Sequence, residues 1–87
     1  MTSTFNGKVT LKVTNKLGEA RVLIIEPWAS EYVLPPGRSF DVIAEGDLSY
    51  PLEVELTPDR ITVYAFDSAG AMLTVHNDGR EVQERGR

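Results

Sequence analysis

Cysteine is absent from this 87-residue sequence, and histidine and tryptophan occur once each. Without cysteine the chain can form no disulfide framework, thiolate metal site or thiol nucleophile, so packing alone must hold its small core. A blue-copper site would need a thiolate and two imidazoles. A catalytic triad is disfavoured because no Gly-x-Ser-x-Gly elbow accompanies His76. These absences predict a protein without cofactor or metal, and we expect no enzymatic activity.

Long apolar runs and clustered cations are also missing. No apolar segment approaches the roughly 20 residues of a membrane span, and the start "MTSTFNGK" lacks the pattern of a signal peptide, so we expect a cytoplasmic protein. Residues 19–59 hold nine acids against Arg21 and Arg38, which argues against nucleic acid as a partner. Three lysines, at positions 8, 12 and 16, fall on one outward face of a predicted strand, where they are typical of a protected sheet edge.

Alternation of apolar and polar residues runs through most of the sequence. In "KVTLKVT" it places Val9, Leu11 and Val13 on one face, whereas "ARVLII" is apolar on both faces, as in a central strand. Turn signals recur at the spacing expected of a sandwich or barrel. We therefore predict one all-β domain over residues 1–87, with frayed ends near 1–6 and 84–87. Its predicted architecture is an antiparallel two-layer sandwich of seven or eight short strands, immunoglobulin-like or related.

The turn around Pro58 and Asp59 sets the register of the two strands beside it. If these two residues are the centre of a type I turn, Thr57 faces Arg60. The flanking strands then present one apolar face, made of Leu52, Val54, Leu56, Ile61, Val63 and Ala65.

Two further turns extend this register toward the C-terminus. A loop of Ser68, Ala69 and Gly70 keeps Leu73 and Val75 on the apolar face, and a turn at "NDG" aligns Val75 with Val82. These turns predict a four-stranded meander in one sheet. Its predicted buried residues are Leu52, Val54, Leu56, Ile61, Val63, Leu73 and Val75.

The same register predicts an aromatic outward face. The residues sent outward are Glu53, Glu55, Thr62, Tyr64, Phe66, Met72, Thr74 and His76. Aromatic side chains beside Met72 and His76, rimmed by carboxylates, favour a protein contact, because they bury a large area at low entropic cost. Alternatively, this face is covered by the N-terminal segment, by the frayed end or by a second copy of the chain.

The segment "EPWASEYVLPPG", residues 26–37, differs from the rest of the chain. Pro27 has no N–H to donate, so it should end the strand before it and let the chain leave that sheet. Trp28 is then predicted to plug the open end of the sandwich, and Pro36 with Gly37 to form a type II turn. In the rival interpretation, Trp28 and Tyr32 form a sugar-stacking platform with Glu26 or Glu31.

Over residues 26–37 the chain resembles short bacterial proteins of unknown function that carry a Glu-Pro-Trp stretch followed by Leu-Pro-Pro-Gly. The resemblance implies a small β domain and supplies no activity, catalytic residue or cofactor.

These patterns together predict a small non-enzymatic binding domain whose partner is another protein or its own copy. The predicted contact residues are Tyr64, Phe66, Met72 and His76, with Trp28 and Tyr32 as the rival site. The alternative function is a carbohydrate-binding module that uses Trp28 and Tyr32.

Overall fold

The structure is a computed structural model that describes residues 6–48, 51–65 and 71–85. These residues contain eight strands: β1 (Asn6–Thr14), β2 (Arg21–Glu26), β3 (Ser30–Leu34), β4 (Ser39–Asp47), β5 (Leu52–Leu56), β6 (Arg60–Ala65), β7 (Met72–Asn77) and β8 (Arg80–Glu81). No helix long and apolar enough to cross a membrane occurs in the described parts of the chain.

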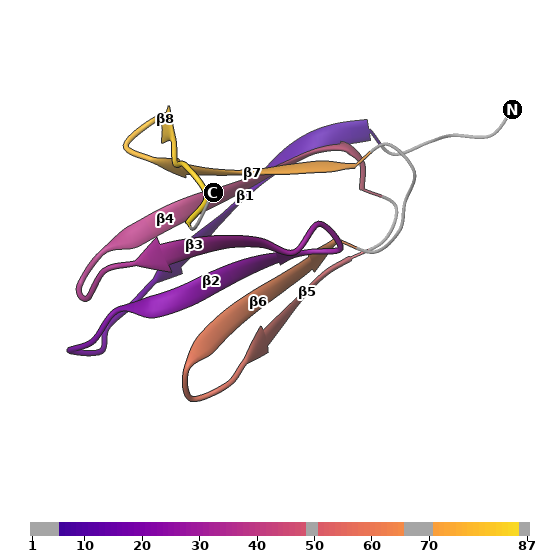
Figure 1. Ribbon diagram of the computed structural model, residues 1–87. Helices are drawn as coiled ribbons and strands as arrows, with labels where there is room; N and C mark the ends of the chain where they lie inside the picture. The colour runs from indigo at the N-terminus through magenta and orange to yellow at the C-terminus, as the bar shows by residue number, and fades with distance from the viewer. Residues whose placement is uncertain (1–5, 49–50, 66–70, 86–87) are drawn as a thin grey trace, which may run out of the picture.

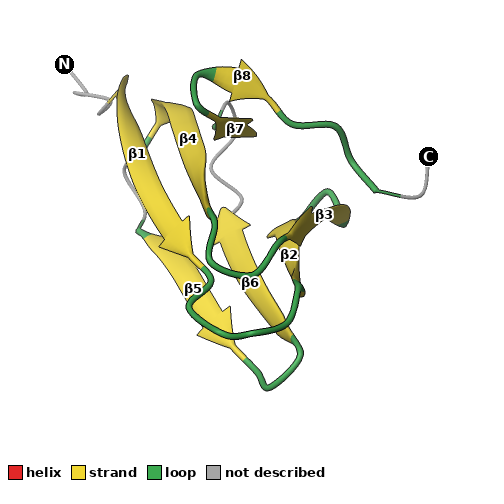
Figure 2. Cartoon of the chain, turned by 90° about the vertical axis from the view of Figure 1, so that its left-hand side faces the viewer, coloured by secondary structure: helices red, strands yellow, loops and turns green. Residues whose placement is uncertain are grey.

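The strands form two four-stranded sheets that pack against each other (Figures 1 and 2). The first sheet has the order β1-β4-β7-β8, and the second has the order β3-β2-β6-β5. The fold is therefore the predicted all-β two-layer sandwich. The neighbouring strands are antiparallel except β2 and β6, which are parallel, so the expectation of a wholly antiparallel arrangement is wrong at this pair. The parallel pair arises because the chain crosses to the first sheet in β4 and returns through β5, and β6 then enters beside β2 in the same direction.

The core lies between the two sheets, and β2 is one of its central strands. Leu23 and Ile25 point into the core, while Ile24 on the opposite face is also buried, which confirms the reading of "ARVLII" as a strand between two neighbours. The first sheet contributes Val42 and Val75, both fully buried, from β4 and β7. Burial of these side chains is the main favourable contribution to folding.

The predicted turns are confirmed where the structure describes them. Thr57 faces Arg60, and the Thr57 N–H donates to the Arg60 carbonyl over 3.0 Å. The β5–β6 ladder pairs Leu52 with Ala65, Val54 with Val63 and Leu56 with Ile61, in the predicted register.

The turn between β7 and β8 also agrees with its prediction. Asp78 and Gly79 have positive φ values of 51° and 81°, as a two-residue type I′ hairpin requires. The Val82 N–H donates to the Val75 carbonyl over 2.8 Å, so these two valines are aligned.

The four-stranded meander is wrong, because β6 lies in the second sheet and β7 in the first. The predicted loop at Ser68–Gly70 lies outside the described residues. Ile61, Val63 and Val75 are buried as predicted, but Leu73 is only half-buried, and it lies on β7 beside Val75, in the sheet opposite Ile61 and Val63. On the edge strand β5 the pattern also fails, since Leu52 is only half-buried and Val54 and Leu56 are exposed. An apolar face is buried only where the other sheet extends over it.

The chain changes sheets at Pro35–Arg38 rather than at Pro27. Pro27 does end β2, but β3 turns back along β2 in the same sheet. The Arg38 N–H donates to the Pro35 carbonyl over 3.2 Å, and Gly37 has a φ of 73°, which confirms a type II turn centred on Pro36 and Gly37.

Asn15 fixes this crossing to the end of β1. Its side chain is buried, and its amide nitrogen donates to the carbonyls of Glu19 at 2.7 Å and Leu34 at 3.1 Å. Its Oδ1 accepts from the Leu17 N–H at 3.0 Å. One buried amide therefore holds the β1–β2 loop against the end of β3.

Candidate functional site

The hairpin between β2 and β3 places Trp28 on the surface. The turn is tight, since Ala29 has a φ of 58°, and the Glu26 carboxylate accepts a hydrogen bond from the Ala29 N–H at 2.9 Å. The Trp28 side chain is 43% exposed. The prediction that Trp28 plugs the end of the sandwich is therefore wrong. After Pro27 the chain does not cross to the other sheet. It turns back as β3 beside β2, and Trp28 lies in the exposed turn between these two strands.

Trp28 lies at a surface groove of about 980 Å³. Three lining residues come from the β2–β3 hairpin (Trp28, Ser30 and Tyr32), three come from β7 (Met72, Leu73 and Thr74), and the remainder are residues 81–84. We call this feature the β3–β7 groove. It lies where the edge of the second sheet faces the outer part of the first, beside the C-terminal segment (Figure 2).

Both strands beside the groove present an edge to it. The strand β3 is the last in its sheet, and β8 pairs only with His76 and Asn77 of β7. Within the described residues, the ladder of β8 thus stops short of the Met72–Thr74 half of β7. Main-chain N–H and C=O groups on a sheet edge are ready partners for another extended chain.

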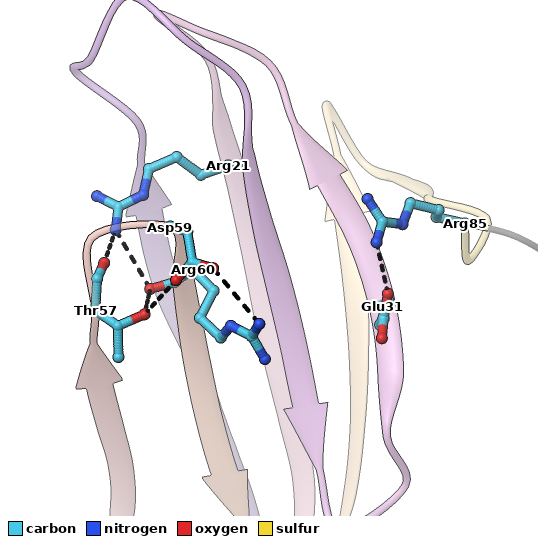
Figure 3. Close-up of polar contacts among 6 residues, drawn as sticks. All are labelled: Arg21, Glu31, Thr57, Asp59, Arg60 and Arg85. Carbon is cyan, nitrogen blue, oxygen red and sulfur yellow. Dashed lines mark hydrogen bonds and ion pairs between the residues drawn. The ribbon is translucent and has the colours of Figure 1, made fainter.

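The C-terminal segment bridges the two edges. After β8 the Val82 N–H donates to Val75 of β7, and the Arg85 N–H donates to the carbonyl of Glu31 on β3 over 2.7 Å. The Arg85 guanidinium also contacts the Glu31 carboxylate at 3.0 Å (Figure 3). A surface ion pair alone contributes little, but here it accompanies a main-chain hydrogen bond and fixes the direction of the segment.

The electrostatic character of the groove is acidic. Tyr32 is only 7% exposed, and burial raises the pKa of its phenol, followed by the nearby carboxylates of Glu84 and Glu81, while a hydrogen bond with Ser30 partly opposes these effects. The phenol is therefore neutral at physiological pH. The groove thus combines one exposed indole, one phenol and two carboxylates.

The predicted outward face is divided between the two sheets. Met72, Thr74 and His76 alternate on β7, and the His76 Nε2 lies 2.9 Å from the Thr74 Oγ1. Tyr64 lies on β6 in the other sheet, so the expectation of one contiguous Tyr64–Met72 surface is wrong. Phe66 lies outside the described residues.

Tyr64 belongs to an acidic surface on the second sheet. Its hydroxyl donates to the Glu55 Oε1 at 3.2 Å, and its pKa is raised first by the charge of Glu55, with smaller contributions from burial, Glu26 and Glu53. Trp28, Tyr32 and Met72 thus line the groove together, whereas Tyr64 and His76 are not among its lining residues.

Residues 81–84 line the groove, although this was not predicted from the sequence. A signal was present, because Glu81 and Glu84 lie within five residues after the "NDG" turn. That turn fixes Val82 beside Val75, but only the tertiary structure brings β3 next to the residues that follow.

Within residues 6–48, 51–65 and 71–85, no three histidine, aspartate or glutamate side chains gather as they would around a metal ion. Comparisons of the chain with protein-family models, with curated proteins and with solved structures found no match. The local resemblance over residues 26–37 therefore stays a prediction.

Proposed function

We propose that this domain is a non-enzymatic binding module that takes an extended segment of another protein into the β3–β7 groove. One observation carries the proposal: the chain's own C-terminal segment already forms main-chain hydrogen bonds with β7 at Val75 and with β3 at Glu31. Both strands therefore already hydrogen-bond to the main chain of another segment, which supports binding of a further segment there. Recognition of peptides by strand edges takes affinity from such bonds and specificity from pockets for alternate side chains.

The chemistry of the groove favours a basic and apolar segment. Glu81 and Glu84 line it and contribute negative charge, which complements lysine or arginine. The exposed Trp28 ring can stack with a cationic side chain, while Met72 adapts its shape to an apolar one. The ion pair between Arg85 and Glu31 shows the same combination of a cationic and an acidic side chain within the chain itself.

A carbohydrate-binding module is the second candidate, and the exposure of Trp28 favours it. An indole at the rim of a polar groove can stack on a sugar ring. Against this candidate, Tyr32 is buried, so the two aromatic rings do not form a shared exposed platform. The peptide proposal accounts for the strand edges as well as for the indole.

The test uses the intrinsic fluorescence of Trp28, which is the only tryptophan. A synthetic peptide that alternates lysine and valine should shift the emission to shorter wavelength in a saturable manner, because binding covers the indole. The matched peptide that alternates glutamate and valine should produce no saturable shift.

A pair of charge variants localises the binding. Glu81→Lys should weaken the lysine–valine peptide about tenfold, equal to about 1.4 kcal/mol. Glu19→Lys makes the same charge change in the exposed β1–β2 loop and should leave the affinity unchanged. The proposal is wrong if neither peptide changes the emission, or if Glu19→Lys weakens binding as much as Glu81→Lys. A saturable response to oligosaccharides with none to peptides supports the carbohydrate module.

A further inference from the structure

The side of the sandwich opposite the groove is open. Here β1 is the last strand of the first sheet and β5 the last strand of the second, and Figure 2 shows both on the same side of the molecule. Val54 of β5 faces inward, yet it is 44% exposed, while its ladder partner Val63 on β6 is fully buried.

Two further apolar side chains lie on this side. Leu56 of β5 is 71% exposed, although its ladder partner Ile61 is buried, and Val9 of β1 is exposed although its partner Ala44 is buried. The inward pattern of β1 and β5 is thus apolar, but neither strand is fully covered by the opposite sheet. These three side chains give the open side exposed apolar surface, which is typical of interaction sites.

The two edges carry opposite charge. Lys8 and Lys12 are exposed on β1, and Glu53 and Glu55 are exposed on β5. Among the described strands, β1 pairs only with β4 in the first sheet, and β5 pairs only with β6 in the second. Each edge therefore presents its charges beside main chain that pairs with no further strand of the described residues, and each edge complements the other in charge.

We propose that a second copy of this chain docks on the open β1–β5 side to form a two-fold symmetric dimer, in which β1 of each copy lies beside β5 of the other. The inference is independent of the β3–β7 groove, which lies on the opposite side of the sandwich.

The charges select one symmetry axis. A two-fold axis perpendicular to the sheets would place β1 beside β1 and β5 beside β5, so lysines would face lysines and glutamates would face glutamates. An axis parallel to the strands places each β1 beside a β5, and both contacts then join opposite charges. Because a two-fold interface uses the same surface patch twice, the apolar side chains of both copies, Val9, Val54 and Leu56, are covered together.

Sedimentation of the full chain tests this dimer. At micromolar concentration and about 0.01 M salt, where the Debye length is about 30 Å, we expect a dimer. Raising the salt to about 1 M, where the Debye length is about 3 Å, should weaken it at least about tenfold, because the charges at both contacts are exposed.

Charge reversal identifies the two edges. The Lys8→Glu/Lys12→Glu variant and the Glu53→Lys/Glu55→Lys variant should each be monomeric, because every β1–β5 contact then joins like charges. An equimolar mixture of the two variants should form a heterodimer, because both contacts again join opposite charges. Far-UV circular dichroism of each variant should match the parent, since all four side chains are exposed.

An apolar substitution with a matched control completes the test. Leu56→Asp should give a folded monomer, while Val33→Asp, an exposed position on the outer face of β3, should leave the dimer intact. A parent that is monomeric at low salt overturns the proposal, as does a dimer that persists in either charge variant. Peptide binding to the groove is measured by Trp28 fluorescence and dimer formation by sedimentation. A monomeric parent would therefore contradict the dimer without changing the result for peptide binding.

Discussion

Substitution of Val63 tests the core and the register of β6 together. Val63 is fully buried, and it belongs to the same core cluster as Val42 and Val75 of the first sheet. We expect Val63→Asp to unfold the domain, because the new carboxyl group has no partner among these apolar side chains.

The size of the effect follows from two contributions. Burying a polar group without a hydrogen bond costs about 2–7 kcal/mol, and losing the buried valine side chain costs about 1.5–3 kcal/mol more. A chain of 87 residues has a total stability of about 4–13 kcal/mol at the usual 0.05–0.15 kcal/mol per residue. The expected loss is therefore comparable to the whole free energy of unfolding.

Two companion variants make the measurement quantitative. Val63→Ala removes two methyl groups, at about 0.8 kcal/mol each, and leaves a cavity, so it should cost about 2–3 kcal/mol and lower the melting temperature by about 10–20 °C. Val33→Asp introduces the same carboxyl group at a site that is 41% exposed and should cost less than about 1 kcal/mol.

The assays are urea denaturation and thermal denaturation, both followed by far-UV circular dichroism at a protein concentration low enough to keep the chain monomeric. Two results would contradict the burial of Val63: Val63→Asp melts within a degree or two of the parent, or Val33→Asp costs as much stability as Val63→Asp. Either result would mean that β6 does not present Val63 to the core.

Two other predictions concern buried polar groups. In urea denaturation, Asn15→Ala should lower the free energy of unfolding by about 1–3 kcal/mol, because it removes the partner of the buried Leu34 carbonyl and of the Leu17 N–H. The control Lys16→Ala, at the exposed neighbouring position, should change the stability by less than about 0.5 kcal/mol. Equal effects of the two substitutions would contradict the role of Asn15. Burial in the folded state raises the pKa of the Tyr32 phenol above its ordinary value of 10. The stabilisation contributed by the neutral phenol is therefore fully present below about pH 10, and it is lost as the pH rises through the pKa of the folded state. Tyr32→Phe should make the alkaline loss of stability shallower, and an unchanged slope would contradict this assignment.

The sequence alone determined the strands and the turns that join neighbours in the chain. The Thr57–Arg60 and Val75–Val82 pairs, and the turn at Pro36–Gly37, all appeared in the structure as predicted. These turns and pairs can be predicted from the sequence because proline fixes φ, glycine permits a positive φ, and the alternation of apolar and polar side chains sets the register of paired strands. These are local properties, which the chain carries wherever the strand is finally placed.

Only the tertiary structure decided which sheet each strand joins and how far each sheet covers the other. Val54 and Val63 are partners on one apolar face, but Val63 is buried and Val54 is exposed because β5 is an edge strand. Likewise, Tyr64 and Met72 are separated because β6 and β7 belong to different sheets, while Trp28 and Met72 line one groove because the β2–β3 hairpin lies on the same side of the sandwich as β7. Burial and site formation depend on contacts between residues far apart in the chain, and no local pattern specifies these contacts.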